Sequence, residues 1–176
     1  FMKNALKFVS YGKIRTSFGT SGSDQIGDYQ YLDSYQSTDA PSGLYPTQLF
    51  NADFAWEENK KLEIALHLGF FNDRFNMGVN WYRNSSSNQL VGYPLAATTG
   101  FNSVLANLPA TVENTGWEIE LSTTNIHTNN FRWQTSFNIS IPKNKLLSFP
   151  DIDQTAYAQQ YRIGHPLNIR LLYQYE

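Results

Sequence analysis

The sequence predicts an all-β fold whose antiparallel strands form part of a transmembrane outer-membrane β-barrel. Three observations carry this prediction. Apolar and polar residues alternate with period two, as in a sheet with two chemically different faces. The polar positions hold mainly asparagine, serine, threonine and glycine instead of lysine and glutamate. Short and long connections alternate between the expected strands, which is typical of outer-membrane barrels.

The composition of the 176 residues excludes several classes of protein. Charged residues make up 16% of the chain, below the roughly 25% of an average soluble domain, and aromatic residues make up 15%. The formal net charge of −2 argues against a nucleic-acid binder, which normally carries a basic face. The absence of cysteine excludes a disulfide framework and a thiolate zinc site. A transmembrane helix is excluded because no run of roughly 18 apolar residues occurs.

The N-terminal strand pair has the weakest pattern. Ile14, Thr16 and Phe18 alternate with polar residues, and a second strand is expected over residues 29–34. The stretch between them, residues 19–27, is rich in glycine and serine, which favour turns and loops.

Two hairpins follow with clearer alternation. Apolar residues occupy every second position of residues 62–70, and the turn residues Asn72, Asp73 and Arg74 lead into a second alternating run from Phe75. The later hairpin has strands over residues 117–121 and 131–141, joined by a polar connection at residues 125–130. Each pair predicts an antiparallel hairpin with one apolar face.

Connection lengths predict a membrane orientation and an incomplete barrel. The connections at residues 72–74 and 125–130 are short, whereas long loops are expected over residues 37–55, 84–115 and 142–168. A sixth strand is expected to begin within residues 167–173. Bacterial single-chain barrels begin at about eight strands, and open sheet edges cost several kcal/mol per unpaired group in lipid. We therefore expect the chain to be a segment of a larger barrel.

Tryptophan positions fit two membrane–water interfaces, where amphipathic rings are favoured. Trp56, Trp81 and Trp117 are expected where strands meet long loops, and Trp133 lies among phenylalanines near a short turn. The sequence therefore predicts four membrane-interface anchors: Trp56, Trp81, Trp117 and Trp133.

The sequence contains no recognisable catalytic, cofactor or metal motif. Its three histidines are far apart and no HExxH pair, P-loop or GxSxG elbow is present. Glu118 and Glu120 have the spacing of paired carboxylates, about 7 Å along a strand, but we interpret them as hydrated wall positions. The expected loops carry rings suited either to stacking on sugars or peptides or to packing loops together: Tyr35, Tyr45, Tyr93 and Phe101. No substrate-binding residue is assigned.

Several segments, in order along the chain, are specific enough to compare with a family. The chain resembles the later barrel of SusC/RagA-type TonB-dependent outer-membrane transporters. Departures from the family pattern are Ser23, Pro109 and Pro142. The segments that carry the resemblance are Phe1–Asn4, Gly12–Gly19, Gly22–Tyr29, Asn51–Glu57, Thr99–Phe101, Val112–Glu118, Asn144–Leu146 and Ile163–Leu167.

The resemblance implies a 22-stranded barrel closed by a plug domain, of which residues 1–176 are a partial β-barrel segment without the plug and the remaining strands. It implies a location in the outer membrane of a Gram-negative bacterium, in contact with its lipid. It also implies import of oligosaccharides or peptides, with a SusD-like surface lipoprotein as partner. Energy would come from the TonB complex, which contacts an N-terminal region absent from this chain.

The resemblance implies neither a cofactor nor an enzymatic activity. Two alternatives remain open at this point. One is a soluble β-sandwich that binds carbohydrate, whose apolar faces would meet in a dry core. The other is an all-β glycosidase that uses Glu118 and Glu120.

Overall fold

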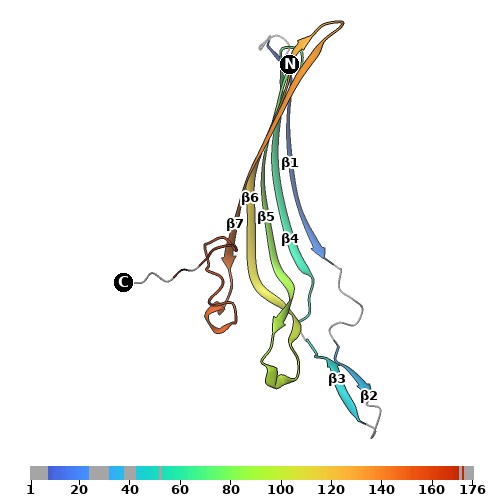
Figure 1. The fold of residues 1–176 in the computed structure, drawn as a ribbon, viewed down its shortest axis with the longest axis vertical. Coiled ribbons are helices and arrows are strands. Elements are labelled where there is room, and N and C mark those ends of the chain that lie inside the picture. The colour runs from blue at the N-terminus through green and yellow to red at the C-terminus, as the bar shows by residue number, and fades with distance from the viewer. Residues whose placement is uncertain (1–7, 24–31, 38–42, 52, 171, 173–176) are drawn as a thin grey trace. The chain divides into compact units, whose positions relative to one another are not determined.

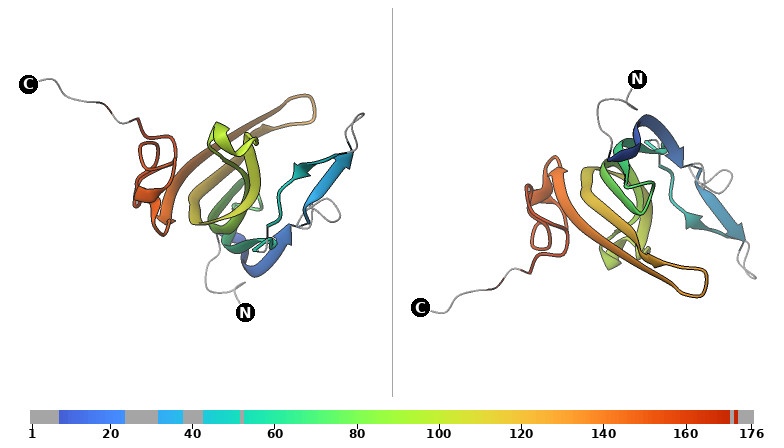
Figure 2. Two further views of the ribbon diagram at one scale, coloured as in Figure 1. Left: turned by 90° about the horizontal axis from the view of Figure 1, so that it is seen from below. Right: turned by 90° about the horizontal axis from the view of Figure 1, so that it is seen from above.

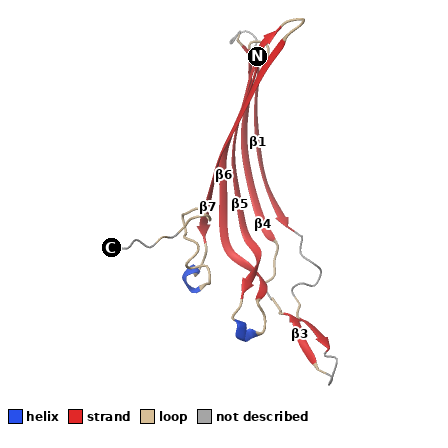
Figure 3. Ribbon diagram, in the orientation of Figure 1, coloured by secondary structure: helices blue, strands red, loops and turns tan. Residues whose placement is uncertain are grey.

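The computed structural model describes residues 8–23, 32–37, 43–51, 53–170 and 172. Its long elements are strands, and two short 3-10 turns, Ala97–Thr99 and Ile152–Gln154, lie in connections (Figure 1, Figure 3). None of the helical segments in these ranges is long and apolar enough to cross a membrane. The strands are β1 (Val9–Ser23), β2 (Ser34–Ser37), β3 (Leu44–Gln48), β4 (Glu57–Phe70), β5 (Phe75–Pro94), β6 (Ser103–His127) and β7 (Arg132–Ser148).

The strands form two sheets. The larger has the order β1-β4-β5-β6-β7, and the blue-to-orange colours follow this order in the end views (Figure 2). Strands β2 and β3 form a separate antiparallel pair, with Gln36 opposite Tyr45 and Ser37 opposite Leu44. Strands β4, β5, β6 and β7 are neighbours in sequence order, as expected for successive hairpins.

The β4–β5 connection confirms the predicted tight turn. Phe71, Asn72 and Asp73 have φ values of 55°, 55° and 61°, and the Arg74 amide donates to the Phe71 carbonyl at 3.3 Å. Asn and Asp tolerate the left-handed region better than other non-glycine residues. The side chain of Asn76 closes the turn by donating to the Asp73 carbonyl at 2.7 Å.

The predicted long loops are wrong in extent. β5 continues to Pro94 and β6 starts at Ser103, so most of residues 84–115 is strand. β3 lies inside the expected loop 37–55, and β7 continues to Ser148 within 142–168. The alternation of apolar and polar residues marks only the extent of the apolar face. The strands continue beyond it, because backbone hydrogen bonding between strands does not depend on apolar side chains.

The weaker terminal predictions also need correction. Residues 29–31 of the strand expected over residues 29–34 lie outside the described residues, and the strand of the structure, β2, begins only at Ser34. The sixth strand is not present over residues 167–170, which form a turn and irregular backbone. The rest of that expected strand, apart from Leu172, lies outside the described residues.

The chain divides into two compact units. The first comprises residues 1–19, 60–84 and 113–144, and the second comprises residues 20–59, 85–112 and 145–176. The second unit contains a small core of Ala110, Val112, Leu146 and Phe149. In the first unit, Ala65 is the only buried hydrophobic residue among those the structure describes.

The segment after β7 folds back onto the second unit's core. The Leu146 amide donates to the His165 carbonyl at 2.9 Å, and the Gly164 amide donates to the Leu146 carbonyl at 2.8 Å. Gly164 has a φ of 86°, a conformation that glycine adopts without strain. Tyr157 is the centre of this packing, with its ring centroid 6.1 Å from Tyr93, 6.0 Å from Phe149 and 5.8 Å from Tyr161.

Candidate functional site

Three contacts establish how β5 and β6 pair in the first unit. Asn80 Nδ2 donates to Glu118 Oε2 at 3.1 Å, and the Thr124 amide donates to the Arg74 carbonyl at 2.7 Å. A Cβ placed on Gly78 would lie 3.8 Å from the Cβ of Glu120. All three contacts fit one antiparallel register. That register places Trp81 opposite Trp117 and Val79 opposite Ile119.

Side-chain contacts establish the registers of the β4–β5 and β6–β7 pairs in the same way. Gly78 lies beside His67, and the rings of Phe70 and Phe75 are 5.8 Å apart, which gives the β4–β5 register. Asn144 Nδ2 donates to Asn114 Oδ1 at 2.6 Å, which gives the β6–β7 register together with the bond from Gln134 Nε2 to Thr124 Oγ1 at 3.3 Å.

These registers align apolar residues in rows across one face of the sheet. Many of the side chains stay exposed, including half of Trp117 and 55% of Phe137. The following three rows contain no polar residue. From β4 to β7 the rows are Ile64–Trp81–Trp117–Ile141, Leu66–Val79–Ile119–Ile139 and Leu68–Met77–Leu121–Phe137.

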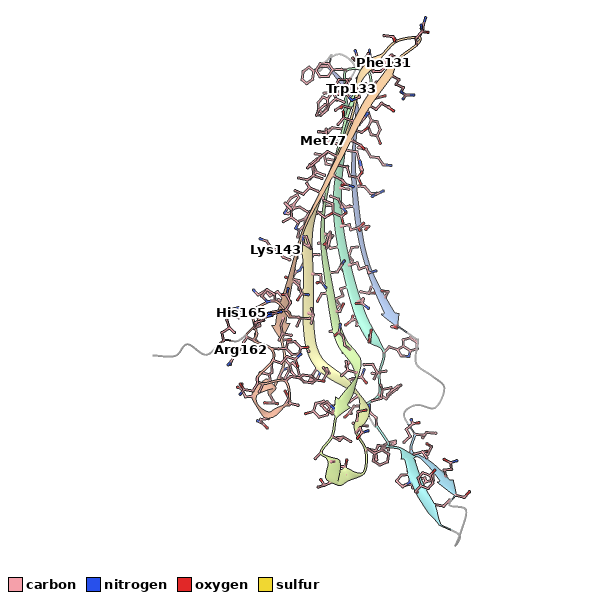
Figure 4. All side chains as sticks on the ribbon, viewed as in Figure 1. Met77, Phe131, Trp133, Lys143, Arg162 and His165 are labelled. Carbon is pink, nitrogen blue, oxygen red and sulfur yellow. The ribbon has the colours of Figure 1, made fainter. Side chains whose placement is uncertain are left out.

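Aromatic residues close this apolar face at the turn end. The Phe8 and Phe70 rings are stacked with centroids 6.4 Å apart, and Phe75 packs edge-on against Phe70. Phe131 and Trp133 lie at the same end of β7 (Figure 4) and are more than half exposed. This arrangement agrees with the expected belt of rings near the short turns.

Trp81 and Trp117 do not lie where strands meet loops, contrary to the expectation from the sequence, whereas Trp56 and Trp133 do lie at strand ends. Trp81 and Trp117 lie inside β5 and β6, because both strands continue beyond the apolar face. Trp133 is the second residue of β7, and Trp56 immediately precedes β4 and packs over Gly22 in the second unit. Their role as membrane-interface anchors remains a prediction.

The opposite face of the first unit is polar and forms a shallow cavity of about 380 Å³. Gly78 keeps the centre of this face open, because a Cβ there would lie 3.2 Å from Nδ1 of His67. Hydroxyl, amide, imidazole and carboxylate groups line the cavity, so it can exchange hydrogen bonds with water or a polar ligand. Its side chains include Tyr11, His67, Asn76, Glu120, Ser136 and Asn138.

The carboxylates of Glu118 and Glu120, both on this face, have separate surroundings. Glu118 accepts a hydrogen bond from Asn80, whereas Glu120 lines the cavity. The Oδ1 atom of Asn80 is buried and has no hydrogen-bond partner among the described residues. Within the described ranges, no cluster of three or more His, Asp or Glu residues could hold a metal ion. The arrangement therefore fits a hydrogen-bonding wall.

Gly116 is a structural position that the sequence analysis did not identify. A Cβ on this buried glycine would lie 2.5–2.7 Å from three atoms of the Tyr82 phenol, so the ring rests on the glycine backbone. On the other face of β6, Glu113 forms an ion pair with Arg83 of β5. A glycine within a strand is the sequence signal for such a close approach.

Asparagine side chains attach residues 51–56 to β5 and β6 in the second unit. Asn107 Oδ1 accepts from the Ala55 amide at 2.9 Å, and its Nδ2 donates to the Ala55 carbonyl at 2.7 Å and to the Asn88 carbonyl at 3.0 Å. Asn88 Nδ2 donates to the Trp56 carbonyl at 3.0 Å, and Asn51 Nδ2 donates to the Leu105 carbonyl at 2.8 Å. We call Asn51, Asn88 and Asn107 the asparagine clamp.

The four loop aromatics lie in three separate places. Tyr93 packs on Tyr157, and Phe101 lines a cavity of about 100 Å³, so both pack connections together. Tyr35 and Tyr45 lie on the β2–β3 pair, where Tyr45 Oη donates to Gln36 Oε1 at 2.8 Å. A hydrogen bond to the Asp33 carboxylate, with its negative charge, raises the pKa of Tyr35. Tyr35 and Tyr45 remain the candidates for ligand stacking.

Comparison with known proteins identifies the class. The family model described as TonB dependent receptor-like, beta-barrel matches residues 4–168. TonB-dependent receptor P39 of Formosa agariphila is 34% identical over 156 residues, which cover 87% of this chain and 15% of that receptor. TonB-dependent receptor SusC of Bacteroides thetaiotaomicron is 24% identical over 99% of this chain and 20% of its own length. The chain thus spans only 15% to 20% of the length of these relatives.

Solved structures show the same fold. The structure of the RagAB peptide transporter matches 94% of this chain and 19% of its own, with a TM-score of 0.76 and 22% identity. The RagAB peptide importer in the 'closed-closed' state gives a TM-score of 0.77 at 23% identity. The chain belongs to the TonB-dependent receptor β-barrel family, and the resemblance to its SusC/RagA type is confirmed.

Proposed function

We propose that the full-length protein is an outer-membrane importer of oligosaccharides or peptides, and that this chain forms part of its barrel wall. One observation carries the proposal. The rows from Ile64 to Ile141 expose apolar side chains on one face, while His67, Glu120 and Asn138 line a polar cavity on the other. In a membrane barrel these faces contact lipid and the aqueous lumen, respectively.

Exposed apolar area favours lipid over a soluble environment. Monomeric soluble proteins rarely expose large continuous apolar patches. Trp117, Phe137, Ile139 and Ile141 are each more than 40% exposed. A soluble β-sandwich would bury these residues beneath a second sheet, whereas here they are exposed. We therefore reject the soluble carbohydrate-binding module.

The importer mechanism follows from the family. Cargo is captured at the outer face, a plug inside the barrel moves when the TonB complex supplies energy, and the cargo passes through the lumen. RagAB is a peptide transporter, which supports peptide as one cargo class. The resemblance to the SusC/RagA type, which the relative SusC and the RagAB structures share, supports the pairing with a SusD-like lipoprotein. Tyr35 and Tyr45 are proposed as cargo contacts on the loop side.

The surroundings of Glu118 and Glu120 favour a role in the wall of a transporter over a role in glycoside hydrolysis. Glu118 is engaged by Asn80, and no general acid–base arrangement accompanies Glu120 in the described part of the chain. The proposal is tested with the full-length protein in its own bacterium. It should fractionate with the outer membrane, co-purify with a surface lipoprotein, and support peptide or oligosaccharide uptake that stops when TonB is removed. Recovery from the soluble periplasm would overturn the proposal.

A further inference from the structure

Positive charge appears on the lipid-facing side directly beyond the paired tryptophans. The register places Arg83 and Lys143 in the row next to Trp81 and Trp117, with Thr115 between them. Lys143 is exposed and lies on β7 well away from the turn end (Figure 4). Neighbouring strands are about 4.8 Å apart, so the two backbones lie roughly 10 Å from each other. Long cationic side chains can reach across that gap.

We propose that Arg83 and Lys143 form a binding site for the phosphate of a lipid headgroup in the outer leaflet. The inference rests on the proposed membrane location. Tryptophan is favoured at the headgroup level of a bilayer, so the next row outward faces the headgroups. The short turns of such barrels lie on the periplasmic side, which places the row of Arg83 and Lys143 at the outer leaflet.

The geometry of Arg83 suits a phosphate ligand. Its Nε forms the ion pair with Glu113, whose side chain is 15% exposed, while the Arg83 side chain is 53% exposed. A guanidinium has further N–H donors on its two terminal nitrogens, and it binds phosphate in a planar, bidentate manner. Glu113 therefore orients Arg83, and Lys143 adds a second positive charge across Thr115.

The position of Arg83 and Lys143 on the apolar face makes transported cargo an unsuitable ligand. Cargo would pass along the polar face, whereas Arg83 and Lys143 share the face of Trp81 and Ile141. Lys61 provides a matched comparison, because it lies on the same strand end of β4 but on the opposite, polar face. A lipid with an apolar tail would pack its chains on the apolar rows and its phosphate on the two cations. A free phosphate would have no such tail contact.

Native mass spectrometry of the purified full-length receptor tests the site. The probes are dioleoyl phosphatidic acid and dioleoylglycerol, which differ in the phosphate. The receptor should retain the phosphatidic acid preferentially. Lys143→Gln, which leaves the Arg83–Glu113 pair intact, should reduce this preference about fivefold, and adding Arg83→Gln should reduce it about fivefold again. Lys61→Gln should leave the preference unchanged.

Each alternative result has a defined meaning. An unchanged preference in the Lys143→Gln and double variants, each still folded by heat-dependent gel migration, would overturn the phosphate site. Equal displacement of the lipid by inorganic phosphate would also overturn it, in favour of a free anion site. Failure of the receptor to retain either lipid, together with recovery outside the membrane fraction, would instead overturn the proposed function.

Discussion

At the scale of single residues, a close backbone approach organises the polar face. Tyr82 occupies the space where a side chain of residue 116 would lie, with its hydroxyl oxygen 2.5 Å from the position of a Cβ. Only glycine fits beneath the ring without a shift of the Tyr82 side chain. Covering a strand glycine with an aromatic ring from the neighbouring strand restores packing that glycine itself does not provide.

Gly116→Val should destabilise the folded barrel by about 1–3 kcal/mol, because the added methyl groups displace Tyr82. Gly19→Val is the matched control, since a Cβ on Gly19 meets no atom within 4 Å among the described residues. The measurement is urea-dependent unfolding of the full-length receptor in vesicles. A midpoint for Gly116→Val equal to that of Gly19→Val would contradict the role of the contact.

The face of the sheet on which a residue lies could be predicted from the sequence only where apolar and polar residues alternate. The alternation of apolar and polar positions correctly assigned Ile119 and Glu120 to opposite faces. The pairing of Trp81 with Trp117 could not be read, because it depends on the register between strands and not on either strand alone. The contact of Tyr82 with Gly116 has the same origin.

At the scale of elements, the hairpins were predictable and their lengths were not. The turn at Asn72–Arg74 carries its own sequence signal, so the boundary between β4 and β5 was found. The end of β5 and the start of β6 carry no such sequence signal, because both strands extend beyond the region in which apolar and polar residues alternate. Side chains such as Asn59, which accepts a hydrogen bond from Ser86, maintain pairing there.

The asparagine clamp shows how an irregular segment is attached to these extended strands. Asn107→Ala removes three hydrogen bonds to backbone groups of Ala55 and Asn88. Each of these hydrogen bonds contributes about 0.5–1.5 kcal/mol, so the attachment of residues 51–56 to β6 should weaken. Limited proteolysis should show faster cleavage within residues 51–56, with membrane insertion unchanged.

Asn129→Ala is the control for this experiment, because Asn129 is exposed in the turn between β6 and β7. Its cleavage pattern should match that of the unmodified receptor. Equal protection of residues 51–56 in the Asn107→Ala receptor would show that other contacts hold the segment.

At the scale of the whole molecule, the sheet is incomplete as a membrane structure by itself. β1 and β7 are the terminal strands of the five-stranded order, and open edges are not tolerated in hydrocarbon. The chain spans 15% of TonB-dependent receptor P39, whose remaining length can supply further strands. The sequence predicted this incompleteness from strand number, whereas the cargo could not be predicted because loop aromatics serve both packing and binding.

The most direct test of the account is spin-label accessibility at two adjacent residues of β6 in the full-length receptor in vesicles. Ile119→Cys and Glu120→Cys, each labelled with a nitroxide, place the probe on the apolar row and in the polar cavity. We expect strong relaxation by oxygen, which is lipid-soluble, at residue 119 and by a water-soluble nickel chelate at residue 120. Nickel accessibility at residue 119 equal to that at residue 120 would contradict contact between the apolar rows and lipid.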